Sequence, residues 1–223
     1  MPKLAGISTE LVRMMKRFLC CFLLMFATAA PAAFALDEKT PPDVLVRSVT
    51  NDVLTIVRED KAIQSGDTAR VLGLVEDRVL PHFNFRRMTM LAVGRDWRSA
   101  TPAQQDRLTE AFKTLLVRTY SNALTQYREQ VIDFKPTRMG ATDTTVQVRT
   151  EVRQPGAQPI GIDYMLEKTG TGWKVFDVVV AGVSLVTNYR GSFGSEVRSN
   201  CIDGLIRSLE AKNSSLVSAQ AGS

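Results

Sequence analysis

The chain has few side chains with which to carry out chemistry. Its single histidine, His82, stands between Pro81 and Phe83 at a predicted joint between two helices. The sequence contains no glycine-rich phosphate loop and none of the patterns G-x-S-x-G, H-E-x-x-H or C-x-x-C. A serine or cysteine nucleophile would need His82 as its base, and a histidine in such a place is more often a structural residue. The sequence therefore predicts no nucleophilic catalysis.

Asp177 is the stronger candidate for acid–base chemistry. Within the apolar run from Trp173 to Val180, Asp177 and Lys174 are the only charged residues. A carboxylate on an apolar sheet face tends to hold its proton and can transfer it. If a four-residue turn pairs this run with the preceding strand, Tyr164 faces Asp177, and the pair could act on a small apolar substrate. The alternative is a structural carboxylate that accepts hydrogen bonds from Tyr164 or the backbone.

The elements that position these residues meet at Gly182. A β-branched run, Trp173 to Val180, follows a glycine-rich turn and predicts a strand, and Ser184 is a good N-cap for a helix after it. Strict alternation puts Phe176, Val178 and Val180 on one face and Trp173, Val175 and Val179 on the other. Because both faces are apolar, the strand must be covered on both.

The rest of the chain divides into helices, strands and helices again. Alternating hydrophobicity predicts four strands, at 131–138, 145–153, 160–168 and 173–180, with Leu166 facing Val175 and Ile162 facing Val179. Thr101-Pro102-Ala103-Gln104 is a capping box that begins a long helix reaching Tyr127. Apolar spacing and capping residues predict the other helices at 43–64, 68–80, 84–94, 184–199 and 203–211. This order indicates an α+β fold, in which helices cover the concave side of one curved, four-stranded antiparallel sheet.

The first 35 residues have the pattern of a cleaved secretory signal peptide. Lys16-Arg17 precedes an apolar run from Phe18 to Ala30, and Ala33-Phe34-Ala35 is a cleavage site of small residues. The alternatives are a cut after Ala29 and an uncleaved membrane anchor. We expect residues 36–212 to form a single domain and residues 213–223 a frayed polar tail.

Removal of that segment changes the charge of the chain. The net charge falls from +5 to +2, because the segment holds four basic residues against one acidic residue. With no basic run, the sequence argues against a nucleic-acid partner. The only cysteine that remains is Cys201, so the sequence predicts no internal disulfide and no metal site.

Three stretches of the sequence form a recognisable pattern. They are VLPHFNF (79–85) with Gly94 and Trp97 after it, FKTLLVRTY (112–120), and WKVFDV (173–178) continuing into GVSLVTNYR (182–190), Phe193 and DGLI (203–206). Together they resemble the toluene-tolerance family over nearly the whole mature chain. The resemblance implies a cone-shaped, NTF2-like fold around an apolar cavity.

The resemblance also implies a function. Family members are periplasmic carriers that hold phospholipid as cargo, use no cofactor and do not act as enzymes. They pass the lipid between an outer-membrane lipoprotein–porin complex and an inner-membrane ABC transporter complex with an MCE-domain subunit, which maintains outer-membrane lipid asymmetry. The alternatives are an isomerase or hydrolase on an NTF2-like scaffold that uses Asp177 and Tyr164, and an adaptor protein.

On this reading we expect the cavity to be lined by valine-rich strands and by one stripe of the long helix. The candidate lipid-binding residues are Leu91, Phe112, Leu115, Leu116, Tyr120, Leu124, Val146, Val148, Ile162, Tyr164, Val175 and Val179. For the phosphate of the head group, the free N–H groups of the helix that begins at Ser184 form a candidate anion site, and Arg190 lies within two turns of it. The alternative is that Ser184 only caps its helix and Arg190 pairs with a nearby acceptor.

Overall fold

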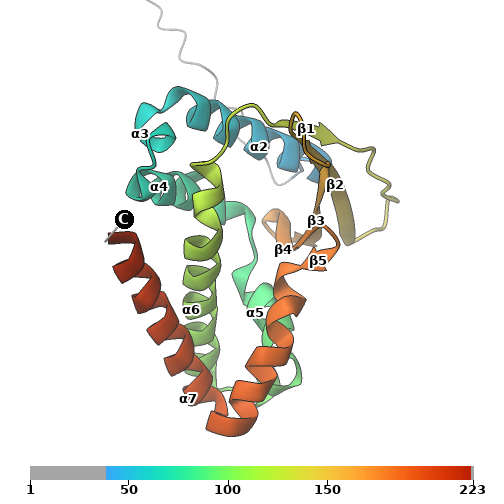
Figure 1. Ribbon diagram of the computed structural model, residues 1–223. Helices are drawn as coiled ribbons and strands as arrows, with labels where there is room; N and C mark the ends of the chain where they lie inside the picture. The colour runs from blue at the N-terminus through green and yellow to red at the C-terminus, as the bar shows by residue number, and fades with distance from the viewer. Residues whose placement is uncertain (1–38, 222–223) are drawn as a thin grey trace, which may run out of the picture. The chain divides into compact units, whose positions relative to one another are not determined.

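The computed structural model describes residues 39–221, and the expected signal peptide lies outside the described residues. The α-helices are α2 (Pro42–Glu59), α3 (Lys61–Gln64), α4 (Thr68–Arg78), α5 (Phe85–Val93), α6 (Pro102–Tyr120) and α7 (Leu185–Ala221), shown in Figure 1. Two 3₁₀ helices, η1 (Leu80–His82) and η2 (Gly94–Ser99), connect α4 to α5 and α5 to α6, and a third, η3 (Ser121–Leu124), leads from α6 toward the first strand. The strands are β1 (Val131–Phe134), β2 (Thr145–Arg153), β3 (Ile160–Thr169), β4 (Gly172–Val180) and β5 (Val183–Ser184).

The helix ends follow the capping residues of the sequence. Thr101 and Gln104 form the predicted capping box at the start of α6. The side chain of Asn84 accepts a hydrogen bond from the amide of Arg87 at the start of α5. The predicted helix 43–64 is divided at Asp60, which is extended (ψ 104°) and whose carboxylate caps α3. This cap gives α3 its own start and lets the chain turn away from α2.

The strands form one antiparallel sheet in the order β1-β2-β3-β4-β5. The prediction of four strands is therefore one short. The chain reverses at Ala181 and Gly182, which both have positive φ, and β5 then pairs with the end of β4. A two-residue strand is too short for an alternating pattern to reveal it.

A β-bulge in β4 changes the predicted register. Lys168 pairs with Trp173 and Leu166 with Val175, as predicted, but the register then shifts so that Phe176 has no opposite residue. Beyond the shift, Asp177 lies opposite Met165 and Val178 opposite Tyr164. The predicted Tyr164–Asp177 pair is therefore wrong.

The predicted pairing of Ile162 with Val179 is wrong for the same reason, because Ile162 lies opposite Val180. Since opposite residues share a face of the sheet, Val178 and Val180 join Val175 on one face. Val179 lies on the other face, together with Asp177.

Helices cover the sheet from two directions. Leu45 and Val46 of α2 pack on Val146, Val148 and Leu166 of the sheet. On the opposite face, the bulged Phe176 packs against the core that α5, α6 and α7 share, and Arg87 of α5 stacks over its ring at 4.2 Å. Figure 1 shows α6 running beside the second half of α7, and the two helices are in extensive contact.

α7 consists of two helical segments joined at Cys201, whose φ of 59° breaks the helix. The sequence predicts this break between residues 199 and 203. A Cβ atom on Gly204 would lie 2.3 Å from Cβ of Asn200, so only glycine fits inside the kink. The kink turns the second segment back along α6.

Residues 213–221 continue α7 rather than forming the frayed tail that the sequence predicts. The side-chain amide of Asn213 donates to the carbonyl of Ala111 at 2.9 Å, and Leu216 packs on the helical core. These contacts hold the end of the chain on α6. Within residues 39–221, no helix combines the length and the apolar character needed to cross a bilayer.

Candidate functional site

A cavity of about 570 Å³ lies between α2 and the sheet. Its volume is in the range of small-molecule sites in proteins. Its walls come from α2, η1, η3 and the facing sides of β1 to β4, and most of its lining residues are apolar: Leu45, Val46, Val49, Val53, Leu54, Val79, Phe83, Ala123, Leu124, Ile132, Val152, Ile162 and Val175. We call this cavity the large chamber.

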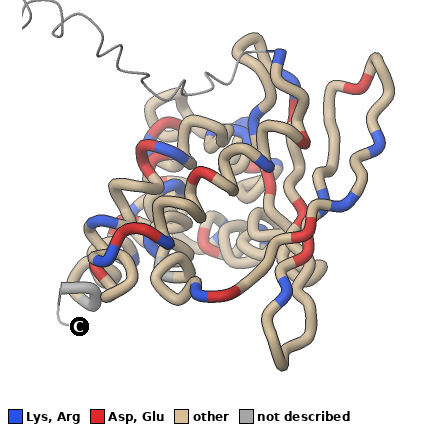
Figure 2. The backbone as a smooth tube through the Cα atoms, turned by 90° about the horizontal axis from the view of Figure 1, so that it is seen from above, with Lys and Arg blue, Asp and Glu red and all other residues tan. Residues whose placement is uncertain are grey.

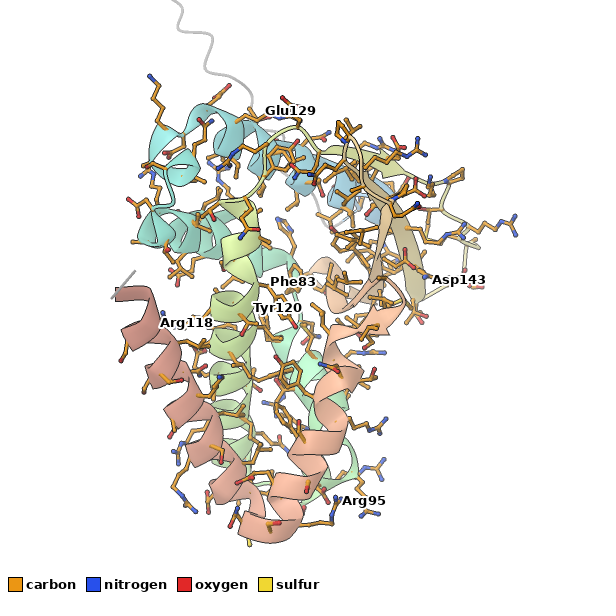
Figure 3. All side chains as sticks on the ribbon, in the orientation of Figure 1. Phe83, Arg95, Arg118, Tyr120, Glu129 and Asp143 are labelled. Atoms are coloured by element: carbon orange, nitrogen blue, oxygen red, sulfur yellow. The ribbon has the colours of Figure 1, made fainter. Side chains whose placement is uncertain are left out.

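A second cavity of about 250 Å³, the small chamber, adjoins the first. It lies among α4, α5, α6 and β4, and its lining is almost wholly apolar. The two chambers share the residues Val53, Val79, Phe83 and Leu124. Phe83 and Tyr120 point into the space between α6 and β4 (Figure 3). The chambers are therefore adjoining parts of one apolar interior.

Three residues with hydroxyl groups line the large chamber, and two of them, Thr50 on α2 and Tyr164 on β3, are hydrogen-bonded to each other. Burial raises the pKa of the Tyr164 phenol, and its hydrogen bond with Thr50 partly offsets this rise. The phenol therefore stays neutral at physiological pH. The wall of the chamber at this point is polar but uncharged.

His82 also lines the large chamber and is half-buried. Burial lowers the pKa of its imidazole, and the positive charge of Lys174 lowers it further. Lys174 is held nearby because its ammonium donates to the carbonyl of Pro81 at 2.8 Å. His82 is therefore neutral at pH 7, which keeps a charge out of the chamber.

This lowered pKa predicts a loss of stability in mild acid. Between the lowered pKa and the ordinary value of 6.5, the unfolded chain binds more protons than the folded one, so the free energy of unfolding falls as pH falls. In denaturant titrations at about pH 7.5 and about pH 5.5, wild type should lose more stability than His82→Gln. Acidic groups contribute equally to both proteins, so an equal loss would contradict the assignment.

Amide side chains lie at one end of the large chamber. Gln126, Gln130 and Gln154 line it there, and the amide of Gln130 donates to that of Gln154 at 3.2 Å. Arg58 donates to the hydroxyl of Tyr127 at 2.5 Å, and this hydroxyl donates to the carbonyl of Gln130 at 2.7 Å. These bonds tie the segment after η3 to α2 and to the end of β2.

Six of the twelve candidate cavity residues line the chambers. Leu124 lines both chambers, Ile162, Tyr164 and Val175 line the large chamber, and Leu116 and Tyr120 line the small one. The small chamber also carries a polar link between helices, because the phenol of Tyr120 lies against that of Tyr189 on α7. Burial and then this neighbouring phenol raise the pKa of Tyr189 to about 12.

The structure places the other six candidates outside both chambers. Leu91, Phe112 and Leu115 pack in the core between α5, α6 and α7. Val146 and Val148 are buried beneath α2. Val179 lies on the opposite sheet face because of the bulge.

The twelve candidate cavity residues include none of those that α2 and the segment after α4 contribute. The side chains of Val46, Val49 and Val53 recur at helical spacing in the sequence, but nothing local shows that this stripe faces a cavity rather than solid core. Phe83, which lines both chambers, stands in the VLPHFNF stretch that carries the family resemblance.

Asp177 is a structural acceptor in this fold. Its carboxylate accepts from the amide of Val178 at 2.8 Å, from the hydroxyl of Ser184 at 2.5 Å and from the amide of Val186 at 3.2 Å. It does not line either chamber, and Tyr164 lies on the other face of the sheet. The structure therefore does not bring the two proposed acid–base residues together.

The same bonds bear on the expected head-group contacts. Ser184 caps α7 by accepting from the amide of Thr187 at 3.0 Å, and it donates to Asp177. A carboxylate thus already occupies the start of α7, where an anion was expected to bind. Arg190 lies against Gly94 and lines neither chamber.

Basic and acidic residues are interspersed along the described backbone (Figure 2). Among the residues that the structure describes, no three His, Cys, Asp or Glu side chains are grouped so that they could hold a metal ion. The arrangement is suited to binding an apolar ligand in its interior.

The fold and the cavity define an α+β domain with a preformed, ligand-sized apolar interior. The family model described as "MlaC protein" matches residues 47–211. The chain belongs to this family, which includes the toluene-tolerance proteins that its motifs resemble.

Known relatives agree with this assignment. The chain is 30% identical over 185 residues to the toluene tolerance protein ttg2D of Pseudomonas putida, covering 79% of this chain and 82% of that protein. It is 23% identical over 175 residues to the intermembrane phospholipid transport system binding protein MlaC of Haemophilus influenzae, covering 77% and 82%.

A solved structure is also similar. It is the phospholipid-binding protein from Ralstonia solanacearum in complex with a phospholipid, with a TM-score of 0.73 and 36% identity. The match covers 78% of this chain and 98% of that one.

Proposed function

We propose that this protein is a periplasmic phospholipid carrier that holds acyl chains in its two joined chambers. The observation that carries the proposal is the apolar interior of about 570 and 250 Å³, which has no charged side chain in its lining at pH 7. The phospholipid complex of the Ralstonia solanacearum relative supports the choice of ligand.

The energetics of lipid burial explain why such a site needs few special residues. Burial of each methylene group contributes about 0.8 kcal/mol, so roughly thirty methylenes give about 24 kcal/mol of gross transfer free energy. A bilayer offers the same lipid a similar amount. Transfer between membrane and carrier is then nearly balanced, and exchange requires a dry cavity rather than an acid–base site.

In this role the carrier would exchange lipid with complexes in both membranes. We expect an outer-membrane lipoprotein–porin complex on one side and an inner-membrane ABC transporter with an MCE-domain subunit on the other. Movement of phospholipid between them would maintain the lipid asymmetry of the outer membrane. The intermembrane transport named for the Haemophilus influenzae relative supports this part of the proposal.

Organic extraction of the purified protein followed by mass spectrometry tests the proposal. We expect the full chain, expressed with its N-terminal segment and purified without detergent, to carry about one diacyl phospholipid per chain. A protein of unrelated fold purified in parallel measures carry-over of membrane lipid. Lipid-free protein that also takes up no phospholipid from vesicles would contradict the carrier function.

A further inference from the structure

Four exposed arginine side chains lie on two neighbouring helices, and none of them lines a chamber. Arg95 and Arg98 belong to η2, which is in contact with α7. Because residues three apart eclipse one another in a 3₁₀ helix, their side chains leave η2 on the same side. Arg190 and Arg198 belong to the first segment of α7, roughly two turns apart. We call these four side chains the arginine face.

Two glycine residues allow the arginines of η2 and α7 to lie close together. The guanidinium group of Arg190 lies against Gly94, the residue before Arg95, where a Cβ atom would be 3.1 Å from Nε of Arg190. The guanidinium group of Arg198 reaches back along α7 to Gly194, where a Cβ atom would be 3.4 Å from Nη1. Gly194 is about one turn beyond Arg190. The arginine face is therefore continuous from η2 to α7, and Figure 3 shows Arg95 on the outside of the molecule.

Nearby carboxylates do not balance the charge of the arginine face. Within residues 39–221, Arg98, Arg190 and Arg198 form no ion pair, and Arg95 approaches only Asp96, at 3.8 Å. Five other arginines of the described chain are paired with carboxylates: Arg70, Arg86, Arg87, Arg107 and Arg153. Without residues 1–35 the chain holds 24 basic and 22 acidic residues, so the part of it outside the arginine face has a net charge of −2. The positive charge of the chain is thus concentrated on this face.

The arginine face offers charge but no apolar anchor. Trp97 and Phe193, the aromatic residues between the arginines, are only 7% and 4% exposed. No large apolar side chain of residues 94–99 or 190–198 is exposed. Protein–protein interfaces usually depend on a few aromatic or aliphatic side chains that fill pockets of the partner. A bilayer with anionic head groups instead attracts basic side chains through its surface potential and needs no matching shape.

We propose that the arginine face adsorbs on the surface of a bilayer that contains anionic phospholipid. Its guanidinium groups can approach the head groups without first leaving a carboxylate partner, apart from the long contact between Arg95 and Asp96. Such attraction is screened by salt, so the adsorption is weak and reversible. The proposal goes beyond the carrier function and does not depend on it, because the four side chains lie outside both chambers.

The test removes the charge from each helix separately. In the full chain, Arg95→Gln is combined with Arg98→Gln, and Arg190→Gln is combined with Arg198→Gln. The matched control combines Arg138→Gln with Arg149→Gln, two exposed arginines without an ion pair in the described chain, which lie after β1 and on β2. All three double variants lose the same net charge. A fourth variant, Arg95→Lys with Arg98→Lys, keeps the charge of η2.

Sedimentation with vesicles measures the partition coefficient of each protein at low and at physiological salt. One set of vesicles contains phosphatidylcholine and phosphatidylglycerol in equal amounts, and the other contains phosphatidylcholine alone. Each basic residue near an anionic surface contributes about fivefold to the partition coefficient. Both glutamine double variants of the arginine face should therefore bind the anionic vesicles about 25-fold more weakly than wild type, with unchanged lipid occupancy and melting temperature. The control and the lysine variant should stay within about twofold of wild type.

Three results would overturn the proposal. The first is wild-type protein that binds the anionic vesicles no better than the neutral ones. The second is a control that weakens binding as much as the two arginine-face variants do, because net charge rather than this face would then be responsible. The third is binding to the purified MCE-domain subunit that both arginine-face variants lose while their binding to vesicles is unchanged, which would assign the face to a partner protein.

Discussion

Ile162→Lys is expected to release bound phospholipid from the protein. Ile162 lies on the cavity face of β3, opposite Val180, and lines the large chamber. An ammonium group at this position would be surrounded by acyl chains and apolar side chains without a partner. Burial of such a charge costs at least about 3 kcal/mol, which corresponds to roughly a hundredfold loss of affinity. Mass spectrometry of lipid extracted from the purified variant measures the occupancy directly.

Val179→Lys is the matched control for this experiment. Val179 is half-buried like Ile162 and lies on the neighbouring strand, but the bulge places it on the opposite face of the sheet. Its cross-strand neighbour is Asp163, which would accept a lysine as a partner. This variant should fold and retain its lipid. If both variants carry lipid normally, the large chamber is not where the acyl chains lie.

The contrast between these two residues shows where sequence reasoning ends. The ends of β2 and the starts of β3 and α5 could be predicted, because alternation and capping residues are local signals. The register of β4 could not, because its residues are apolar on both faces and any one-residue shift keeps the pattern. The bulge at Phe176 depends on long-range contacts instead. Arg87 stacks on that ring and also bonds to Glu167 of β3.

The cavity residues on α6 show the same limit. Phe112, Leu116 and Tyr120 belong to one helical stripe, and the stripe alone identifies the buried side of the helix. Phe112 is fully buried and makes edge-to-face contacts with Tyr189 and Phe193 of α7, so it belongs to the solid core. Leu116 and Tyr120, one and two turns further on, line the small chamber. The position at which this stripe passes from solid core to chamber wall is a property of the tertiary structure.

Asp177→Asn is expected to lower the stability of the fold without removing any activity. The carboxylate joins β4 to the start of α7 by accepting from Ser184 and from the amide of Val186. An asparagine can still accept from the amide, but its NH₂ group cannot accept the proton of Ser184, and the charge that favours the helix N-terminus is lost. Hydrogen bonds to charged groups contribute about 1.5–3 kcal/mol each, so the free energy of unfolding should fall by about 2 kcal/mol.

Thermal and denaturant unfolding measure this change, and in a domain of this size the melting temperature should fall by roughly 4–8 °C. Asp163→Asn is the control, because Asp163 lies on the same face of the sheet but accepts only an exposed hydrogen bond from Gln147, at 2.8 Å. Replacement of this exposed carboxylate should change the free energy of unfolding by about 0.5 kcal/mol or less. If the carboxylate of Asp177 is structural, Asp177→Asn must be less stable than Asp163→Asn. If instead Asp177→Asn unfolds like wild type and abolishes a measurable turnover, the carboxylate is catalytic, and the enzyme alternative replaces the carrier.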